Sequence, residues 1–256
     1  MEQRTPGEID AMHAAGQVVA RALAAMRTAV DVGVSPTELD TVGADVLTDA
    51  GADSPFLDYH PSWAPSPFPG VSCISVNDAI VHGIPSSSPL VDGDLVSIDF
   101  GAVLDGWCGD AAISFVVGTP NDLDLKLVDA TVKALDAGIA AATPGSRIGD
   151  VANAIGRKAR RGRYGLLEAH GGHGIGHTMH EAPFVPNEGR KRTGPRLEPG
   201  TVIAIEPMLI AGGGDAYYAG DDGWTLFSAD GSRTAHVEHT VAVTANGPRV
   251  LTSLEP

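Results

Sequence analysis

The sequence predicts an α+β fold built as two similar halves of one catalytic domain that spans residues 1–256. Three observations indicate this: amphipathic helical segments come in pairs, β-rich runs follow each pair, and strand-like segments from the two halves can be aligned. We expect the pseudo-repeats at about residues 5–118 and 121–252, related by a pseudo-twofold axis. With 43% hydrophobic residues, a chain of this length can bury a large core by itself.

Two helix-start signals open the first half. The segment Thr5–Glu8 (TPGE) has the spacing of a capping box, and apolar residues follow it at helical spacing. The segment Ser35–Glu38 (SPTE) repeats this signal with proline at the first helical position, and Gly51 ends the apolar pattern behind it. We therefore expect a long helix followed by a second, shorter one.

Short β-rich runs separated by Gly and Asp begin at Val71. They read VSCISV, LVSIDFG and AISFVVG, and they predict strands. Helical patterns return in residues 121–142 and from Arg147 to about Arg161, and we expect strands to resume at Thr201. The order of helix, helix and strands thus occurs twice.

The repeat places carboxylates at matching positions. Asp92–Asp99 (DGDLVSID) aligns with Pro199–Glu206 (PGTVIAIE), so that each of these strands is expected to end in a carboxylate. A carboxylate among apolar strand residues is costly to bury unless it is paired, protonated or bound to a cation. The alternative, for either residue alone, is a strand end that faces solvent or caps a turn.

Two more carboxylates and a histidine complete a candidate metal centre. Asp110 and Glu238 also adjoin apolar strand residues, and an Asp pair facing a Glu pair can hold two divalent cations about 3.5–4 Å apart. His173 lies in the glycine-rich segment GGHGIGHTMHEAP, which we expect to place ring nitrogens by loop geometry. A phosphate-binding Gly-x-Gly loop is the alternative, although prolines stand where its helix would follow. Oxygen ligands with one imidazole suit cobalt, manganese, iron or zinc.

Composition and charge exclude several classes of function. The net charge of -15 repels nucleic-acid backbones and anionic membranes, so we expect no DNA or membrane partner. The basic run Arg157–Arg163 is either a ribosome or RNA contact or a solvated helix face. Two cysteines, Cys73 and Cys108, make no disulfide framework, and the first residues do not have the pattern of a secretory leader. We expect a cytoplasmic monomer.

Taken together, the motifs resemble those of type I methionyl aminopeptidases, which have the pita-bread fold. The matching stretches are CISVNDAIVHGIP, DGDLVSIDFG, GWCGD, GGHGIGHTMHEAP, PGTVIAIEPM, DGW and VEHTVAV. They occur in the family's order between about residues 5 and 252. The resemblance implies a dinuclear-metal enzyme that removes the initiator methionine from nascent proteins with a small second residue.

The resemblance also implies roles for particular residues. Asp99 would bind one metal, Asp110 and Glu238 would bridge both, and His173 and Glu206 would complete the other. Glu206 would also shuttle the proton during hydrolysis.

Two further histidines are assigned to the substrate by the same resemblance. His180 would contact the scissile carbonyl oxygen, and His82 the peptide nitrogen beyond it. Either histidine alone is as compatible with a structural or surface position. A monovalent cation, sodium or potassium, is expected near Asn77, Ala79 and Thr234.

The expected methionine pocket departs from the family pattern. Phe56 stands where a small residue is usual, with Tyr59 and Trp224 as its aromatic neighbours. The proline-rich loop of residues 60–70 and the segment of residues 211–220 are also unusual, and both are expected to border the cleft. Two alternatives remain: an aminopeptidase of the same fold with Xaa-Pro or other specificity, and a pita-bread binding protein without catalysis.

Overall fold

The computed structural model describes residues 1–167 and 169–254. The described part contains four α-helices: α1 (Pro6–Ala29), α2 (Pro36–Ala50), α3 (Asp122–Ala141) and α4 (Ile148–Arg161). The strands of its main sheet are β1 (Ser72–Val76), β3 (Leu95–Leu104), β4 (Trp107–Val116), β6 (Gly171–Gly174), β7 (Glu181–Pro186), β8 (Val202–Ile205), β13 (Glu238–Thr244) and β14 (Gly247–Val250). Two small sheets contain β2 (Ala79–Val81), β5 (Gly165–Leu166), β9 (Met208–Ile210), β10 (Tyr217–Ala219), β11 (Leu226–Ser228) and β12 (Thr234–His236).

The helix starts are those that the sequence predicts. Thr5 and Ser35 each form a capping box, in which the side chain of Glu8 or Glu38 accepts a hydrogen bond from the backbone N–H of the capping residue. A proline occupies the first turn of each helix. Gly51 ends α2 in the left-handed conformation that a residue without Cβ adopts readily. Local sequence signals therefore set the bounds of the first two helices.

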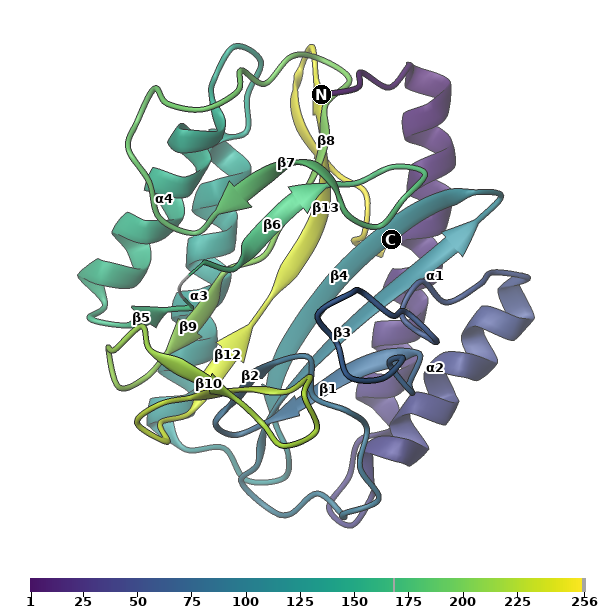
Figure 1. The fold of residues 1–256 in the computed structure, drawn as a ribbon, viewed down its shortest axis with the longest axis vertical. Helices are drawn as coiled ribbons and strands as arrows, with labels where there is room; N and C mark the ends of the chain where they lie inside the picture. Colours follow the sequence, from purple (N-terminus) through teal and green to yellow (C-terminus); the bar gives the residue numbers. More distant parts are fainter. Residues whose placement is uncertain (168, 255–256) are drawn as a thin grey trace.

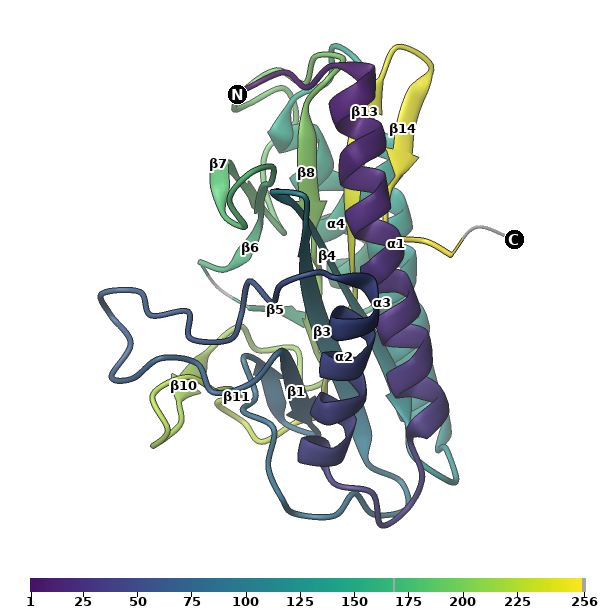
Figure 2. The ribbon, with the colours of Figure 1, turned by 90° about the vertical axis from the view of Figure 1, so that its right-hand side faces the viewer.

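The main sheet has the strand order β1-β3-β4-β13-β8-β6-β7. The β3–β4 hairpin of the first half thus lies beside β13 and β8 of the second half, and the halves meet where β4 pairs with β13. Figure 2 shows all four helices on one face of this sheet, while the loop between α2 and β1 projects from the other face. The helices pack as α1 on α2 and α3 on α4 (Figure 1).

Each half has its own apolar core between its helix pair and its strands. Leu23, Leu39 and Phe100 are buried in the first, whereas Leu135, Ile155 and Ile203 are buried in the second. This packing leaves the opposite face of the sheet free to carry polar side chains. In the described part of the chain, no helix combines the length and the apolar composition that crossing a membrane requires.

Three sequence-based expectations about the strands are wrong. Asp99 does not end its strand but lies in the middle of the ten-residue β3, and Asp110 lies within β4 rather than before it. The strands do not resume at Thr201, because β5, β6 and β7 precede it. The physical reason is that pairing with a neighbouring strand extends each strand beyond the apolar run that signals it.

Candidate metal centre

Asp99 and Asp110 come from the two strands of one hairpin. In the register of β3 and β4, Asp110 lies opposite Gly101 and Asp99 opposite Ala112, so the two aspartates are diagonal neighbours. Thr240 of β13 fixes the backbone at Asp110: its hydroxyl accepts a hydrogen bond from the Asp110 N–H at 3.0 Å and donates one to the Asp110 carbonyl at 2.8 Å. The centre is therefore anchored where the two halves meet.

Glu206 and Glu238 come from two strands of the C-terminal half. Glu238 is the first residue of β13 and pairs with Ala112 of β4, while Glu206 directly follows β8. Glu238 is 2% exposed and Asp110 is 4% exposed, so both carboxylates are effectively removed from water. An Asp pair and a Glu pair thus meet across the β4–β13 seam.

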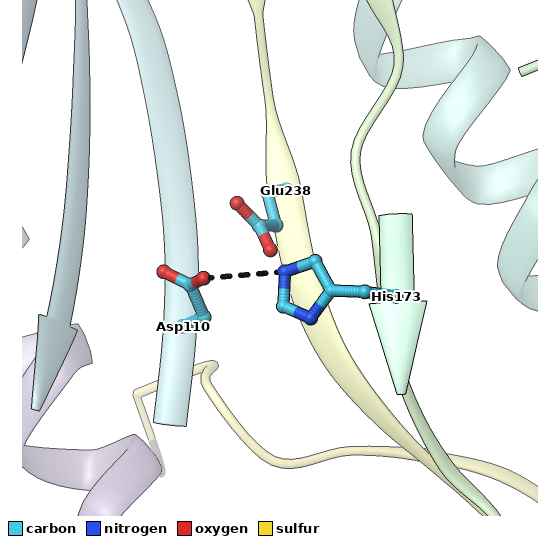
Figure 3. A group of neighbouring side chains, drawn as sticks. All are labelled: Asp110, His173 and Glu238. Atoms are coloured by element: carbon cyan, nitrogen blue, oxygen red, sulfur yellow. Dashed lines mark ion pairs between the residues drawn. The ribbon is translucent and has the colours of Figure 1, made fainter. Parts of the chain in front are cut away.

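His173 lies on β6, a strand, and not on the loop that its glycine-rich segment suggests. A Cβ at Gly172 would lie 2.1 Å from the carbonyl oxygen of Ala204, and one at Gly174 would lie 2.3 Å from that of Ala182. The glycines therefore permit close strand packing. Figure 3 shows His173 directed from β6 toward Asp110 and Glu238.

The orientation of the His173 ring suits metal binding. Its Nδ1 lies 2.9 Å from the Gly174 carbonyl oxygen and can donate to it, which leaves Nε2 as the free ligand atom. That Nε2 lies 3.7 Å from Asp110 Oδ2 and 3.7 Å from Glu206 Oε1.

The electrostatics of the carboxylates favour the binding of a cation. Burial, and then the neighbouring acids, raise the pKa of Asp110 and of Glu238 well above their usual values, and burial raises the pKa of Asp99 to about 7. Within residues 1–167 and 169–254, one oxygen in each of these three side chains is buried without a hydrogen-bond partner. Uncompensated carboxylates at this density are unfavourable, and divalent cations compensate them. The residues present therefore fit a divalent metal centre.

A second histidine, His236, adjoins the same carboxylates and was missed by the sequence analysis. Asp110, His173 and Glu238 form one group whose ligand atoms lie within 4.8 Å of one another, and Glu206, His236 and Glu238 form another. The signal was present in the sequence, because His236 and Glu238 are two residues apart in an extended segment and so point to the same side.

A cavity of about 290 Å³ opens onto these groups. Its walls include all of the residues that the sequence analysis assigned to the divalent metals or the substrate: Phe56, Tyr59, His82, Asp99, Asp110, His173, His180, Glu206, Trp224 and Glu238. Trp63 and Phe68 of the proline-rich loop also line it, which places that loop at the cavity as expected. The segment of residues 211–220 contributes no lining residue in the described part of the chain, and it approaches the wall where the Tyr217 and His170 rings lie 5.1 Å apart.

The two histidines expected at the substrate lie close to the carboxylates. His180 packs against His173 with ring centroids 4.5 Å apart, and His82 follows β2 with a φ of 59°. Burial lowers the pKa of both His82 and His180 to about 4, so both rings are neutral near pH 7. A neutral imidazole can still donate one N–H to a substrate oxygen.

The three residues expected at the monovalent-cation site also lie close together. The Thr234 hydroxyl oxygen lies 2.8 Å from the Ala79 carbonyl oxygen and 3.2 Å from the Asn77 carbonyl oxygen. These oxygens converge between β2 and β12, beside His236 at the end of β12.

The family model described as metallopeptidase family M24 matches residues 10–245 of the chain. The chain belongs to metallopeptidase family M24. Membership of family M24 makes it a hydrolase that binds divalent metal, consistent with the grouped Asp, Glu and His side chains.

Particular members of family M24 narrow the assignment. The chain is 52% identical to methionine aminopeptidase 1 of Mycobacterium tuberculosis, over 98% of this chain and 94% of that protein. The crystal structure of methionine aminopeptidase from Thermotoga maritima superposes with a TM-score of 0.94 at 35% identity, over 99% of this chain and 100% of that one. These similarities confirm the resemblance to type I methionyl aminopeptidases and the pita-bread fold.

A second solved structure bears on the first alternative. Prolidase from Pyrococcus furiosus matches with a TM-score of 0.79 at 24% identity, and this chain covers 66% of its length. At that identity the likeness shows a shared fold and carries no statement about specificity.

Proposed function

We propose that the chain removes methionine from the N-terminus of nascent proteins whose second residue is small. The observation that carries the proposal is the 52% identity, over nearly the whole of both chains, to a methionine aminopeptidase, together with one cavity that joins an aromatic wall to buried carboxylates. An apolar wall beside a charged centre suits a peptide with an apolar first side chain and a free amino group.

In this proposal Asp99, Asp110, His173, Glu206 and Glu238 hold two divalent cations, drawn from cobalt, manganese, iron or zinc. The chemistry that such cations supply is activation of water near neutral pH and stabilisation of negative charge on a carbonyl oxygen.

The chain's own residues supply the remaining steps. The Glu206 carboxylate accepts the proton from the attacking water and passes it to the leaving amine. Burial alone would raise the pKa of Glu206, but the nearby imidazoles of His236 and His173 more than offset this and lower it, so the carboxylate is ionised and ready to accept a proton. His180 donates a hydrogen bond to the carbonyl oxygen as negative charge develops there. His82 contacts the peptide nitrogen beyond the scissile bond.

The methionine side chain is proposed to contact Phe56, Tyr59 and Trp224. Thioether sulfur interacts favourably with aromatic rings, and the Tyr59 and Trp224 rings lie 6.4 Å apart in the cavity wall. Phe56 narrows the pocket and is the residue we expect to tune the preferred first residue.

Other parts of the proposal concern the whole chain. We infer that it acts as a single domain of two pseudo-repeats, at about residues 5–118 and 121–252, and as a cytoplasmic monomer. The basic run of α4 is a candidate ribosome contact, and the oxygens around Thr234 are a candidate sodium or potassium site.

The test is release of methionine from Met-Ala-Ser and Met-Gly-Met-Met by metal-stripped protein, with manganese, cobalt or iron added back and Xaa-Pro peptides assayed alongside. Metal-dependent release of methionine is the expected result. Cleavage of the Xaa-Pro peptides alone would assign the prolidase-like specificity instead, and absence of any cleavage with metal bound would contradict catalysis.

A further inference from the structure

His236 lies in the interior of the molecule, and its ring nitrogen Nε2 has no hydrogen-bonding partner among the residues that the structure describes. The residue is 2% exposed, so water does not reach this nitrogen either. A buried polar atom without a partner costs free energy, and an ion or a water molecule at that position is one physical reason for such an atom.

Two carboxylates lie around this nitrogen. His236 Nε2 lies 3.5 Å from Glu206 Oε2 and 3.8 Å from Glu238 Oε2. These separations are longer than a normal hydrogen bond, which is about 2.9 Å. Two ligands of one cation, each about 2.0–2.2 Å from it, lie roughly 3–3.5 Å apart.

His173 provides an internal standard for these distances. Its Nε2 is 3.7 Å from carboxylate oxygens of Asp110 and Glu206, and the resemblance assigns it to the metal. The separations at His236 match those at His173. Glu206 thus presents Oε1 to one imidazole and Oε2 to the other.

The backbone of His236 is held in place from the main sheet. Its N–H donates to the Ser114 hydroxyl oxygen at 2.9 Å, and its carbonyl accepts from the same hydroxyl at 2.7 Å. Since Ser114 belongs to β4, His236 is tied to the same strand that carries Asp110, one of the proposed metal-binding carboxylates. This is the support that a metal ligand needs.

We propose that His236 is a further nitrogen ligand of the divalent metal centre. Its Nε2 would bind the same cation as Glu206 Oε2 and Glu238. The centre then has two imidazole donors, one on each side of Glu206. A second nitrogen donor favours cobalt, iron or zinc over manganese, which prefers oxygen ligands. The inference rests on the proposed metal centre and adds a residue to it.

The test is proton nuclear magnetic resonance of the cobalt(II)-loaded protein in water. Each metal-bound imidazole gives a paramagnetically shifted, exchangeable N–H resonance. We expect one such resonance that His173→Ala removes and a second that His236→Gln removes. His239→Gln is the matched control, because this neighbouring histidine of β13 has its Nδ1 2.9 Å from the Thr252 hydroxyl oxygen and lies outside the metal groups.

Metal affinity gives a second measurement. Calorimetric titration of metal-free protein should show cobalt binding weakened by about 10-fold or more in His236→Gln, with a smaller change for manganese. The wild-type spectrum alone decides the matter if His236→Gln does not fold. A single imidazole resonance in the cobalt-loaded wild type, lost only in His173→Ala, would overturn the role of His236, whereas failure of the wild type to bind cobalt would overturn the metal centre itself.

Discussion

The indole Nε1 of Trp224 donates a 3.1 Å hydrogen bond to the carbonyl oxygen of Ser66. This bond joins the wall of the cavity to the proline-rich loop that projects from the open face of the sheet (Figure 2). Trp63 of the same loop packs edge-on against Trp224 with ring centroids 5.0 Å apart, although its side chain is 62% exposed. The loop therefore holds an exposed aromatic ring at the cavity mouth.

Trp63→Ala should weaken peptide binding more than chemistry. An aromatic pair contributes about 0.5–1.5 kcal/mol, so we expect KM for methionyl peptides to rise about 2- to 10-fold with kcat nearly unchanged. Steady-state kinetics on Met-Ala-Ser measure both, and Trp63→Phe should restore most of the loss. Equal effects on kcat would argue that the loop takes part in the chemical step.

Asp110→Asn and His173→Ala should each abolish peptidase activity while leaving the fold intact. Each change removes a proposed ligand from a buried centre, and we expect a fall in kcat/KM of about 100-fold or more. Circular dichroism checks the fold, and metal analysis checks occupancy. Full activity in either variant would contradict the metal assignment.

Metal removal should lower the stability of the folded protein near pH 7. Burial raises the pKa values of Asp99, Asp110 and Glu238. Without cations, these crowded acidic groups therefore destabilise the folded state near pH 7. A ligand at 100 times its Kd stabilises the folded state by about 2.7 kcal/mol, and thermal unfolding should show Tm rising with added manganese or cobalt. Magnesium at the same ionic strength controls for a general salt effect.

Gly172→Ala should disturb the packing of β6 without replacing any proposed metal ligand. Its Cβ would lie 2.1 Å from the Ala204 carbonyl oxygen, so β6 must shift and carry His173 with it. We expect a loss of about 1–3 kcal/mol in unfolding free energy and weaker metal binding. Gly214→Ala is the control, because no atom of the described residues, apart from Gly214 and its chain neighbours, lies within 4 Å of the position that its Cβ would take. Wild-type stability and metal affinity in Gly172→Ala would show that the strands tolerate the methyl group.

Acid should remove the contribution of the Arg160–Asp215 pair to stability. The two guanidinium contacts of 2.6 and 2.7 Å hold the pKa of Asp215 below its ordinary value of 3.8, despite partial burial. A lowered carboxyl pKa stabilises the folded state above the unfolded value, and this stabilisation is lost as pH falls through the folded value. Asp215→Asn should therefore cost about 1 kcal/mol or less at pH 7, since both side chains are partly exposed.

The pH dependence distinguishes this pair from a simple packing effect. The difference in unfolding free energy between wild type and Asp215→Asn should narrow as the pH falls below 3.8. Denaturant unfolding at about pH 7, 5 and 3.5 measures it. A difference that stays constant across this range would assign the cost to lost hydrogen-bond geometry rather than to charge.

The sequence by itself determined the features that depend on short stretches of chain. Capping boxes at Thr5 and Ser35 set helix starts because their hydrogen bonds close within three residues. The carboxylates at Asp99 and Glu206 stood out because charged groups in apolar strands demand a partner. The motif order was enough to indicate the pita-bread fold and the methionyl aminopeptidase family.

Only the tertiary structure decided how those residues meet. Strand pairing drew Asp110 into β4, opposite Gly101 of β3, and turned the glycine-rich segment into β6, between β7 and β8, because hydrogen bonds to neighbouring strands outweigh local composition. It also brought His236 of β12 against Glu206 at the end of β8, a contact between segments that are separate in the chain. Long-range pairing therefore decides which of the side chains that the sequence singles out lie next to one another.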